Sequence, residues 1–190
     1  MLSELILNAK ILIIDDELMN VRLLEKILLR EGYLNISLTT DPRDAISMFA
    51  DDEPDLILLD LHMPHQTGFE VMASLASLQD PTVLVPIIVL TADVTPEAKH
   101  RALSGGATDF LSKPFDNTEV ALRIKNALRA RFLQRKLDNQ NKILDERVRQ
   151  GAETLQETLD ELHSIQQRVV SAGTPERAGH DGGRHRPSFQ

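Results

Sequence analysis

The stretch Asp55–Gly68, DLILLDLHMPHQTG, contains four apolar residues, Leu56–Leu59, and then places a carboxylate, Asp60, directly after them. An uninterrupted apolar run of this length is typical of a strand that is covered on both faces. A carboxylate at the end of such a strand costs free energy unless a cation or hydrogen bonds compensate its charge. The stretch therefore predicts a buried strand of a parallel sheet and a carboxylate with a function.

Similar apolar runs recur along the chain, with amphipathic stretches between them. Strands are predicted at Lys10–Ile14, Leu34–Leu38, Leu56–Leu59, Val85–Leu90 and Ala107–Leu111. Helices are predicted at Leu18–Arg30, Pro42–Ala50, Gly68–Leu78, Thr95–Ser104 and from Asp116 onward. Asp41, Thr95 and Asp116 have the side chains of helix N-caps. This alternation predicts an α/β fold with a doubly wound, five-stranded parallel sheet, followed by a long helix.

The composition limits the classes of protein to which the chain can belong. Its 190 residues, 42% of them hydrophobic, suffice for one domain and an appendage, and the lack of Cys excludes disulfides and thiolate chemistry. We expect a cytoplasmic protein without a membrane partner, because no run of about 18 apolar residues and no secretory signal occurs. The first 116 residues carry 8 basic and 19 acidic side chains, which argues against nucleic acid binding.

Beyond Asp116 no further strand is predicted, and helix formers dominate to about Val170. Apolar residues there follow a heptad pattern that predicts a coiled coil. Its predicted dimerisation positions are Leu137, Asn141, Leu144, Val148, Leu155, Leu162, Ile165 and Val169. Asn141 at an a position favours a parallel homodimer, whereas Gly151 and Thr158 weaken two d layers. The alternative is a solvated helix without a partner. Residues 172–190 are rich in Gly, Pro, Arg and His, which predicts disorder.

Four of the predicted strands deliver polar side chains to the same edge of the sheet. The residues are Asp15, Asp16, Asp60, Thr91 and Lys113. Taken singly, each has an ordinary explanation, such as a helix cap, a strand-end hydroxyl or a surface lysine, but their coincidence at the edge where open α/β sheets bind ligands favours a site. Carboxylates that converge need a cation, and oxygen ligands favour Mg²⁺. Asp60 would be a nucleophile toward a phosphoryl group, with Lys113 and Thr91 contacting phosphate oxygens.

The segments ILIIDDE, LILLDLHMP, VLTA and DFLSKPF, in this order and at these separations, resemble the motifs of the response-regulator receiver domain of two-component signalling. The resemblance covers about residues 8–130 and implies a flavodoxin-like (CheY-like) fold. It also implies that Asp60 accepts a phosphoryl group from a kinase phosphohistidine. Mg²⁺ would be bound by Asp16, Asp60 and the main-chain carbonyl of His62, with Asp15 acting mainly through water.

The resemblance further implies a switch in which phosphorylation draws Thr91 inward and an aromatic ring, Phe110, fills the vacated space. Lys113-Pro114 resembles the cis peptide of the family. We also hypothesise that His62 and Asp93, each two residues beyond a site residue, interact and restrict the water that attacks the phosphoryl group. The alternatives are a loop histidine and plain core packing of Phe110.

We therefore expect residues 1–130 to form a receiver domain, 131–171 a coiled-coil linker or dimerisation helix, and 172–190 a tail. The expected function is that of a two-component response regulator that a histidine kinase or phosphotransfer protein phosphorylates and that signals through its coil. It would be no enzyme beyond its own phosphorylation and dephosphorylation. One alternative is the regulatory part of a larger signalling protein with a kinase, diguanylate cyclase or HD-GYP phosphodiesterase output. A less favoured one is a phosphatase with an Asp nucleophile.

Overall fold

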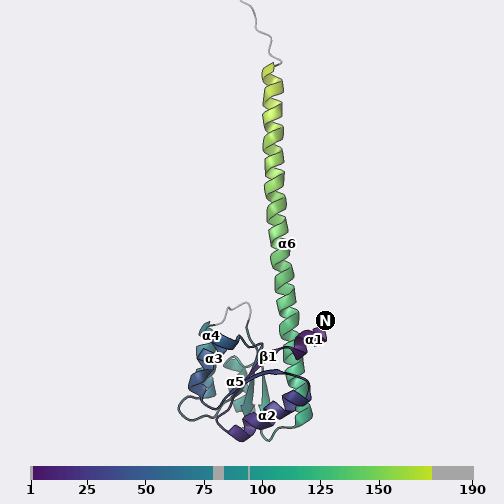
Figure 1. Ribbon diagram of the computed structural model, residues 1–190. Coiled ribbons are helices and arrows are strands. Elements are labelled where there is room, and N and C mark those ends of the chain that lie inside the picture. Colours follow the sequence, from purple (N-terminus) through teal and green to yellow (C-terminus); the bar gives the residue numbers. More distant parts are fainter. Residues whose placement is uncertain (1, 79–83, 94, 173–190) are drawn as a thin grey trace, which may run out of the picture. The chain divides into compact units, whose positions relative to one another are not determined.

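The computed structural model describes residues 2–78, 84–93 and 95–172, in two compact units that comprise residues 1–139 and 140–190 (Figure 1). Helix α6, Asn117–Ala172, contributes residues to both units. None of the described helices is both long enough and apolar enough to span a bilayer.

The first unit contains a five-stranded parallel sheet in the order β2-β1-β3-β4-β5, which confirms the predicted doubly wound architecture. The strands are β1 Lys10–Ile14, β2 Asn35–Thr39, β3 Leu56–Asp60, β4 Ile87–Thr91 and β5 Asp109–Ser112. The helices of this unit are α1 Leu2–Leu7, α2 Leu18–Arg30, α3 Ala45–Asp52, α4 Gly68–Leu78, α5 Pro96–Ser104 and the first part of α6, with a short 3-10 helix η1 at Pro42–Asp44.

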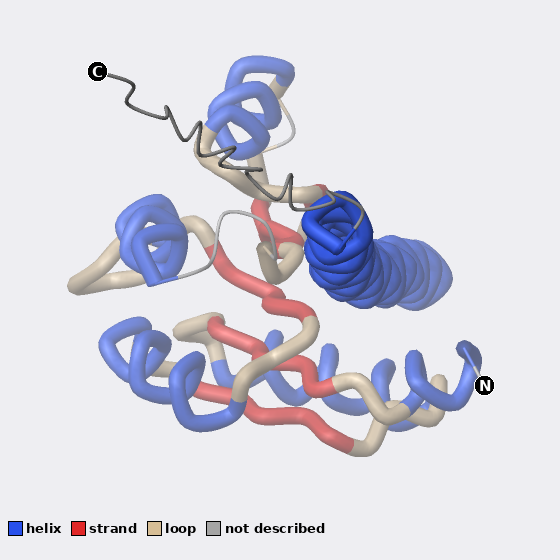
Figure 2. The backbone as a smooth tube through the Cα atoms, turned by 90° about the horizontal axis from the view of Figure 1, so that it is seen from above, coloured by secondary structure: helices blue, strands red, loops and turns tan. Residues whose placement is uncertain are grey.

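Helices cover both faces of the sheet, as Figure 2 shows by the blue segments on either side of the red strands. Apolar side chains of α1, α2 and α6 pack on one face, where Leu24, Leu28 and Ile124 are fully buried. Side chains of α3, α4 and α5 pack on the other face, against strand residues such as Ile57 and Leu59. Burial on both faces explains why β3 has no alternating polar residues.

Several predicted boundaries differ from the structure. The ladder of β4 begins at Ile87 and not at Val85, because Pro86 has no N–H to donate and its carbonyl accepts from Ile57 N at 3.0 Å. The predicted helix at Pro42–Ala50 is divided into η1, which Asp41 caps through Arg43 N, and α3. Helix α1 was not predicted, because a helix of six residues is too short to show a periodicity.

The predicted caps Thr95 and Asp116 accept hydrogen bonds from the main-chain N–H groups of Ala98 and Glu119, and both are confirmed. The predicted cis peptide at Lys113-Pro114 is present. Other strand boundaries differ from prediction by one or two residues, as is usual where the end of a ladder depends on its neighbour.

Two arginines in the first part of α6 contact the edge of the sheet where the strands begin. This edge is opposite to the one that carries Asp60. Arg135 Nη1 lies 2.9 Å from Asp55 Oδ1, immediately before β3, and Arg131 Nη1 donates to the carbonyl of Leu84 at 2.9 Å. Asp55 Oδ2 also accepts from the main-chain N of Lys10 at 3.1 Å. The first unit extends to residue 139, beyond the boundary at residue 130 that the sequence suggests for the receiver.

In the second unit, the described part of α6 is helical to Ala172, and the predicted dimerisation positions within it are solvent-exposed in the single chain. The exposed fraction is 59% for Leu144, 61% for Leu155 and 56% for Leu162. The coiled coil and the parallel dimer remain predictions. Apart from Ala172, the tail predicted to be disordered lies outside the described residues.

Candidate functional site

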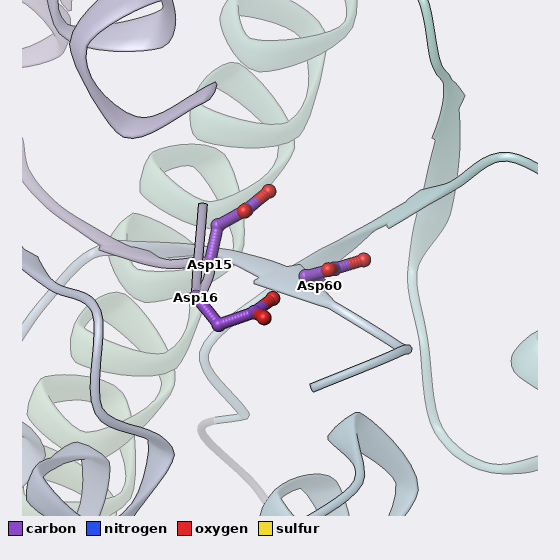
Figure 3. A group of neighbouring side chains, drawn as sticks. All are labelled: Asp15, Asp16 and Asp60. Atoms are coloured by element: carbon purple, nitrogen blue, oxygen red, sulfur yellow. The ribbon is translucent and has the colours of Figure 1, made fainter. Parts of the chain in front are cut away.

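The polar side chains that were predicted to meet at the carboxyl edge of the sheet do so. Asp15 and Asp16 directly follow β1, and Asp60 is the last residue of the adjacent strand β3 (Figure 3). Thr91 ends β4, the neighbour of β3 on its other side, and Lys113 directly follows β5. Strand order and register, set by the buried apolar runs, therefore place these groups together.

Asp15, Asp16 and Asp60 form an acidic cluster in which one carboxylate oxygen from each residue lies within 4.8 Å of the others. Asp15 is fully buried, Asp60 is 4% exposed and Asp16 is half-buried. Three carboxylates at this separation repel one another in a poorly solvated place. The cluster is therefore suited to a cation with oxygen ligands.

Lys113 supplies part of the compensating charge. Its ammonium lies 2.8 Å from Asp15 Oδ2 and 3.1 Å from Asp60 Oδ2. Burial alone would lower the pKa of Lys113, but hydrogen bonding and the charges of the two carboxylates outweigh it and raise the pKa. Burial is also the main cause that raises the pKa of Asp60, with Asp15 adding to it and Lys113 opposing it. One ammonium does not balance three carboxylates, so the site retains a net negative charge.

The hydrogen bonds of the cluster distinguish its members. Asp15 Oδ1 accepts from Glu17 N at 2.9 Å and from Asn20 Nδ2 at 3.1 Å, while Oδ2 accepts from Lys113. Asp16 accepts no hydrogen bond from any residue that the structure describes. Asp15 is thus largely committed to protein donors. Asp60 accepts from Lys113 and from the main chain of His62, while both oxygens of Asp16 stay available to a metal ion. The ligand roles that the resemblance implies remain predictions.

Asn20 was missed by the sequence analysis. It lies in the first turn of α2 and donates to both oxygens of Asp15, at 3.1 and 3.2 Å, and to Glu17 Oε2 at 3.1 Å. Its position five residues after Asp15 was the available signal, because a residue in the first turn of the following helix lies above the end of the strand. Asn20 fixes the orientation of the Asp15 carboxylate.

Thr91 is 3% exposed, and its hydroxyl accepts from Asp93 N at 3.0 Å. The carboxylate of Asp93 accepts from the main-chain N and the hydroxyl of Thr95, at 3.0 and 2.7 Å, and these bonds lower the pKa of Asp93. His62 is exposed, and within the described residues no hydrogen bond joins it to Asp93. The structure brings the two side chains only within electrostatic range, which adds a small lowering of the same pKa.

Phe110 is half-buried in β5 and packs against the core on the side of α4 and α5. Two cations lie over its ring. Lys99 Nζ from α5 is 4.6 Å from the ring centroid, and the guanidinium carbon of Arg123 from α6 is 5.4 Å from it. Neither cation shows a role in the sequence alone.

Gly68, the first residue of α4, sets how closely that helix approaches Asp60. A Cβ added to Gly68 would lie 2.2 Å from the carbonyl oxygen of Asp60 and 2.9 Å from Leu61 Cα. Gly68 N also donates to the carbonyl of Leu61 at 3.1 Å. The backbone that carries the Asp60 carboxylate is thus held against a helix that only glycine allows to come so near.

Comparison with known proteins shows which family has this fold and these site residues. Residues 11–125 match the model of the response regulator receiver domain family. The chain belongs to this family. The receiver domain accounts for most of the first unit, and the acidic cluster, Thr91 and Lys113 lie within the matched residues.

Relatives of the receiver domain include both isolated receivers and much longer proteins. Response regulator PleD of Caulobacter vibrioides is 38% identical over 128 residues, which are 67% of this chain but 28% of PleD. The receiver domain of Francisella response regulator 1452 is 26% identical with a TM-score of 0.58, over 66% of this chain and 99% of that one. NtrX from Brucella abortus is 27% identical with a TM-score of 0.63, over 70% of this chain and 29% of its own. The chain thus spans less than a third of PleD and of NtrX.

Proposed function

We propose that this protein is a response regulator in which Asp60 accepts a phosphoryl group from a phosphohistidine of a histidine kinase or a phosphotransfer protein. The observation that carries the proposal is the position of the Lys113 ammonium, in contact with both Asp15 and Asp60 at the buried end of β3. A lysine there serves as a point charge for a phosphate oxygen once Asp60 is modified. We place the protein in the cytoplasm, where such donors present their phosphohistidines.

In the proposed transfer, a carboxylate oxygen of Asp60 forms a bond to phosphorus while the bond from phosphorus to the donor's imidazole nitrogen breaks. The electron pair of that bond stays on the imidazole, and the product is an acyl phosphate on Asp60. Lys113 balances charge on one phosphate oxygen, and the hydroxyl of Thr91 donates to another after it leaves Asp93 N. Asp16, Asp60 and the carbonyl of His62, with Asp15 through water, would hold Mg²⁺, which would neutralise charge on the transferred oxygens.

Chemistry at this site is limited, in our proposal, to phosphorylation and dephosphorylation of Asp60 itself. Phosphatases of the haloacid dehalogenase type use an acid two residues beyond the nucleophile, and His62 occupies that position here. His62 and Asp93 would instead adjust the lifetime of the acyl phosphate. Since Thr95 now holds the Asp93 carboxylate, this role requires Asp93 to be released. An unchanged dephosphorylation rate in the double Ala variant would exclude it.

The output would pass through α6. The exposed stripe of Leu144, Val148, Leu155 and Leu162 has the heptad spacing of a coiled-coil seam, and a second copy of the chain in parallel orientation would cover it. The greater length of PleD and NtrX supports the alternative that the receiver and its helix regulate a further signalling domain or protein. In either case, a change at the site would alter how two helices pair.

Intact mass spectrometry with acetyl phosphate and Mg²⁺ tests the proposal. We expect the wild type to gain one phosphoryl group only when Mg²⁺ is present, and Asp60→Asn to gain none. Asp51→Asn, which changes an exposed carboxylate on α3, is the matched control and should be phosphorylated like the wild type. Light scattering on the same samples reports a change in assembly. If neither acetyl phosphate nor purified histidine kinases phosphorylate Asp60, the proposed function is wrong.

A further inference from the structure

Two cations that come from different helices lie over the ring of Phe110. Lys99 of α5 lies over the ring at 4.6 Å, and Arg123 of α6 lies over it at 5.4 Å. A cation within about 6 Å of an aromatic centroid is attracted to the ring face, and the attraction is lost when the ring moves away. Each cation therefore favours the present, half-buried position of Phe110 over any position farther inward.

Arg123 is itself held in place by several bonds. Its Nη1 lies 2.8 Å from both oxygens of Asp109, and it also contacts Glu119 Oε1 at 2.7 Å through Nη2. Asp109 Oδ1 in turn accepts from the main-chain N of Phe110 at 2.8 Å. The same carboxylate thus fixes the backbone of Phe110 and the cation above its ring, which joins β5 to α6 at this position.

Thr91, like Phe110, is held in its present position by contacts away from the acidic cluster. Its hydroxyl is bonded to the main chain of Asp93, and among the described residues no hydrogen bond joins it to the acidic cluster; in the proposed switch it would leave Asp93 to make room for Phe110. Inward movement of the ring requires both that Thr91 leaves Asp93 and that Phe110 leaves Lys99 and Arg123. The free energy of the second step adds to that of the first.

We infer that Lys99 and Arg123 are positioning residues that hold Phe110 in the resting state and so set how readily the receiver switches. That phosphorylation moves the ring rests on the proposed function, whereas the contacts of the two cations with the ring are features of the structure itself. Because Arg123 belongs to α6, departure of the ring also removes a contact between β5 and the helix that continues to Ala172, while the bonds of Arg123 to Asp109 and Glu119 remain. The two cations thereby oppose activation, and their removal favours it.

The test uses the full chain with 4-fluorophenylalanine at its six Phe positions, where the fluorine resonance of Phe110 is assigned by its loss in Phe110→Leu. Beryllofluoride with Mg²⁺ serves as the mimic of the phosphoryl group. We expect Lys99→Met and Arg123→Met to shift the Phe110 resonance of the free protein toward its position in the beryllofluoride complex. The apparent affinity for beryllofluoride should rise about two- to fivefold for each variant.

Matched variants separate the ring contact from other causes. Arg101→Met removes a cation that lies 5.0 Å from the ring of Phe69 and should move only the Phe69 resonance. Lys99→Arg keeps a cation over the ring and should behave like the wild type. Glu119→Gln removes an ion pair of Arg123 but keeps the guanidinium of Arg123, and so tests the loss of the ion pair alone. An unchanged Phe110 resonance in Lys99→Met and Arg123→Met, or an equal shift in Arg101→Met, would overturn the inference. Failure of beryllofluoride to bind would count against the proposed function, and an unchanged Phe110 resonance in the two free variants would still overturn this inference.

Discussion

Replacing Gly68 with Ala should destabilise the receiver and displace Asp60. The added Cβ would lie 2.2 Å from the carbonyl oxygen of Asp60, whereas ordinary contacts begin at 3.4 Å, so α4 and the end of β3 must separate by about 1 Å. Both partners are backbone in a buried place and have no flexible side chain with which to relieve the contact. Overpacking of this kind costs about 1–3 kcal/mol.

Two further effects adjust that cost. Separation weakens the hydrogen bond from Gly68 N to the carbonyl of Leu61, which contributes about 1 kcal/mol. Loss of glycine freedom in the unfolded chain returns about 0.4–1 kcal/mol. The expected net loss is therefore about 1–3 kcal/mol. With a urea dependence of about 2 kcal/mol per molar, the unfolding midpoint should fall by roughly 0.5–1.5 M.

Urea titration followed by circular dichroism measures the effect, and Gly151→Ala is the control. No atom lies within 4 Å of the Cβ position at Gly151, so Ala there should only favour the helix, by about 0.5–1 kcal/mol. Gly68→Ala should also slow phosphorylation of Asp60, because the carboxylate moves with its backbone. An unfolding midpoint equal to that of the wild type would show that the close approach of α4 does not constrain Asp60.

Three further predictions concern charge and pairing. Asp60→Asn should raise the free energy of unfolding at pH 7 without divalent cations. The pKa of Asp60 in the folded protein lies above the ordinary 3.8, so the protein loses stability as the pH rises from 3.8 through the folded pKa and the carboxyl ionises. In urea titrations from pH 7 down to pH 3, the gain in the free energy of unfolding should therefore disappear. Lys113→Met should lower the free energy of unfolding by roughly 3 kcal/mol, since it leaves two buried carboxylates without their cation, and a loss below about 1 kcal/mol in urea would contradict the pairing. Asn141→Leu should raise the melting temperature of the coil while allowing more than one oligomer in analytical ultracentrifugation, and a strictly two-stranded product would exclude the register role of Asn141.

The sheet and the acidic cluster could be predicted because their signals are local. An apolar run such as Leu56–Leu59 is typical of a strand buried on both faces of a parallel sheet, and the ends of such strands meet at one edge, so the sequence alone predicts Asp60 beside its partners. Asn20 and Arg123 could not be predicted in the same way. The spacing places Asn20 in the first turn of α2, above the end of β1, but the contacts of both side chains also depend on the rotation of α2 and α6 about their own axes, which side-chain packing decides.

The attachments at the two ends of β3 limit where the chain can change in length. Lys113 contacts Asp60 at one end of the strand, and Arg135 contacts Asp55 at the other. An insertion or deletion within the first turns of α6 would rotate Arg135 by about 100° and shift it by about 1.5 Å for each residue, which would break its contact. Homologues and engineered variants should therefore vary in length after Arg135, and keep the number of residues between Lys113 and Arg135 constant.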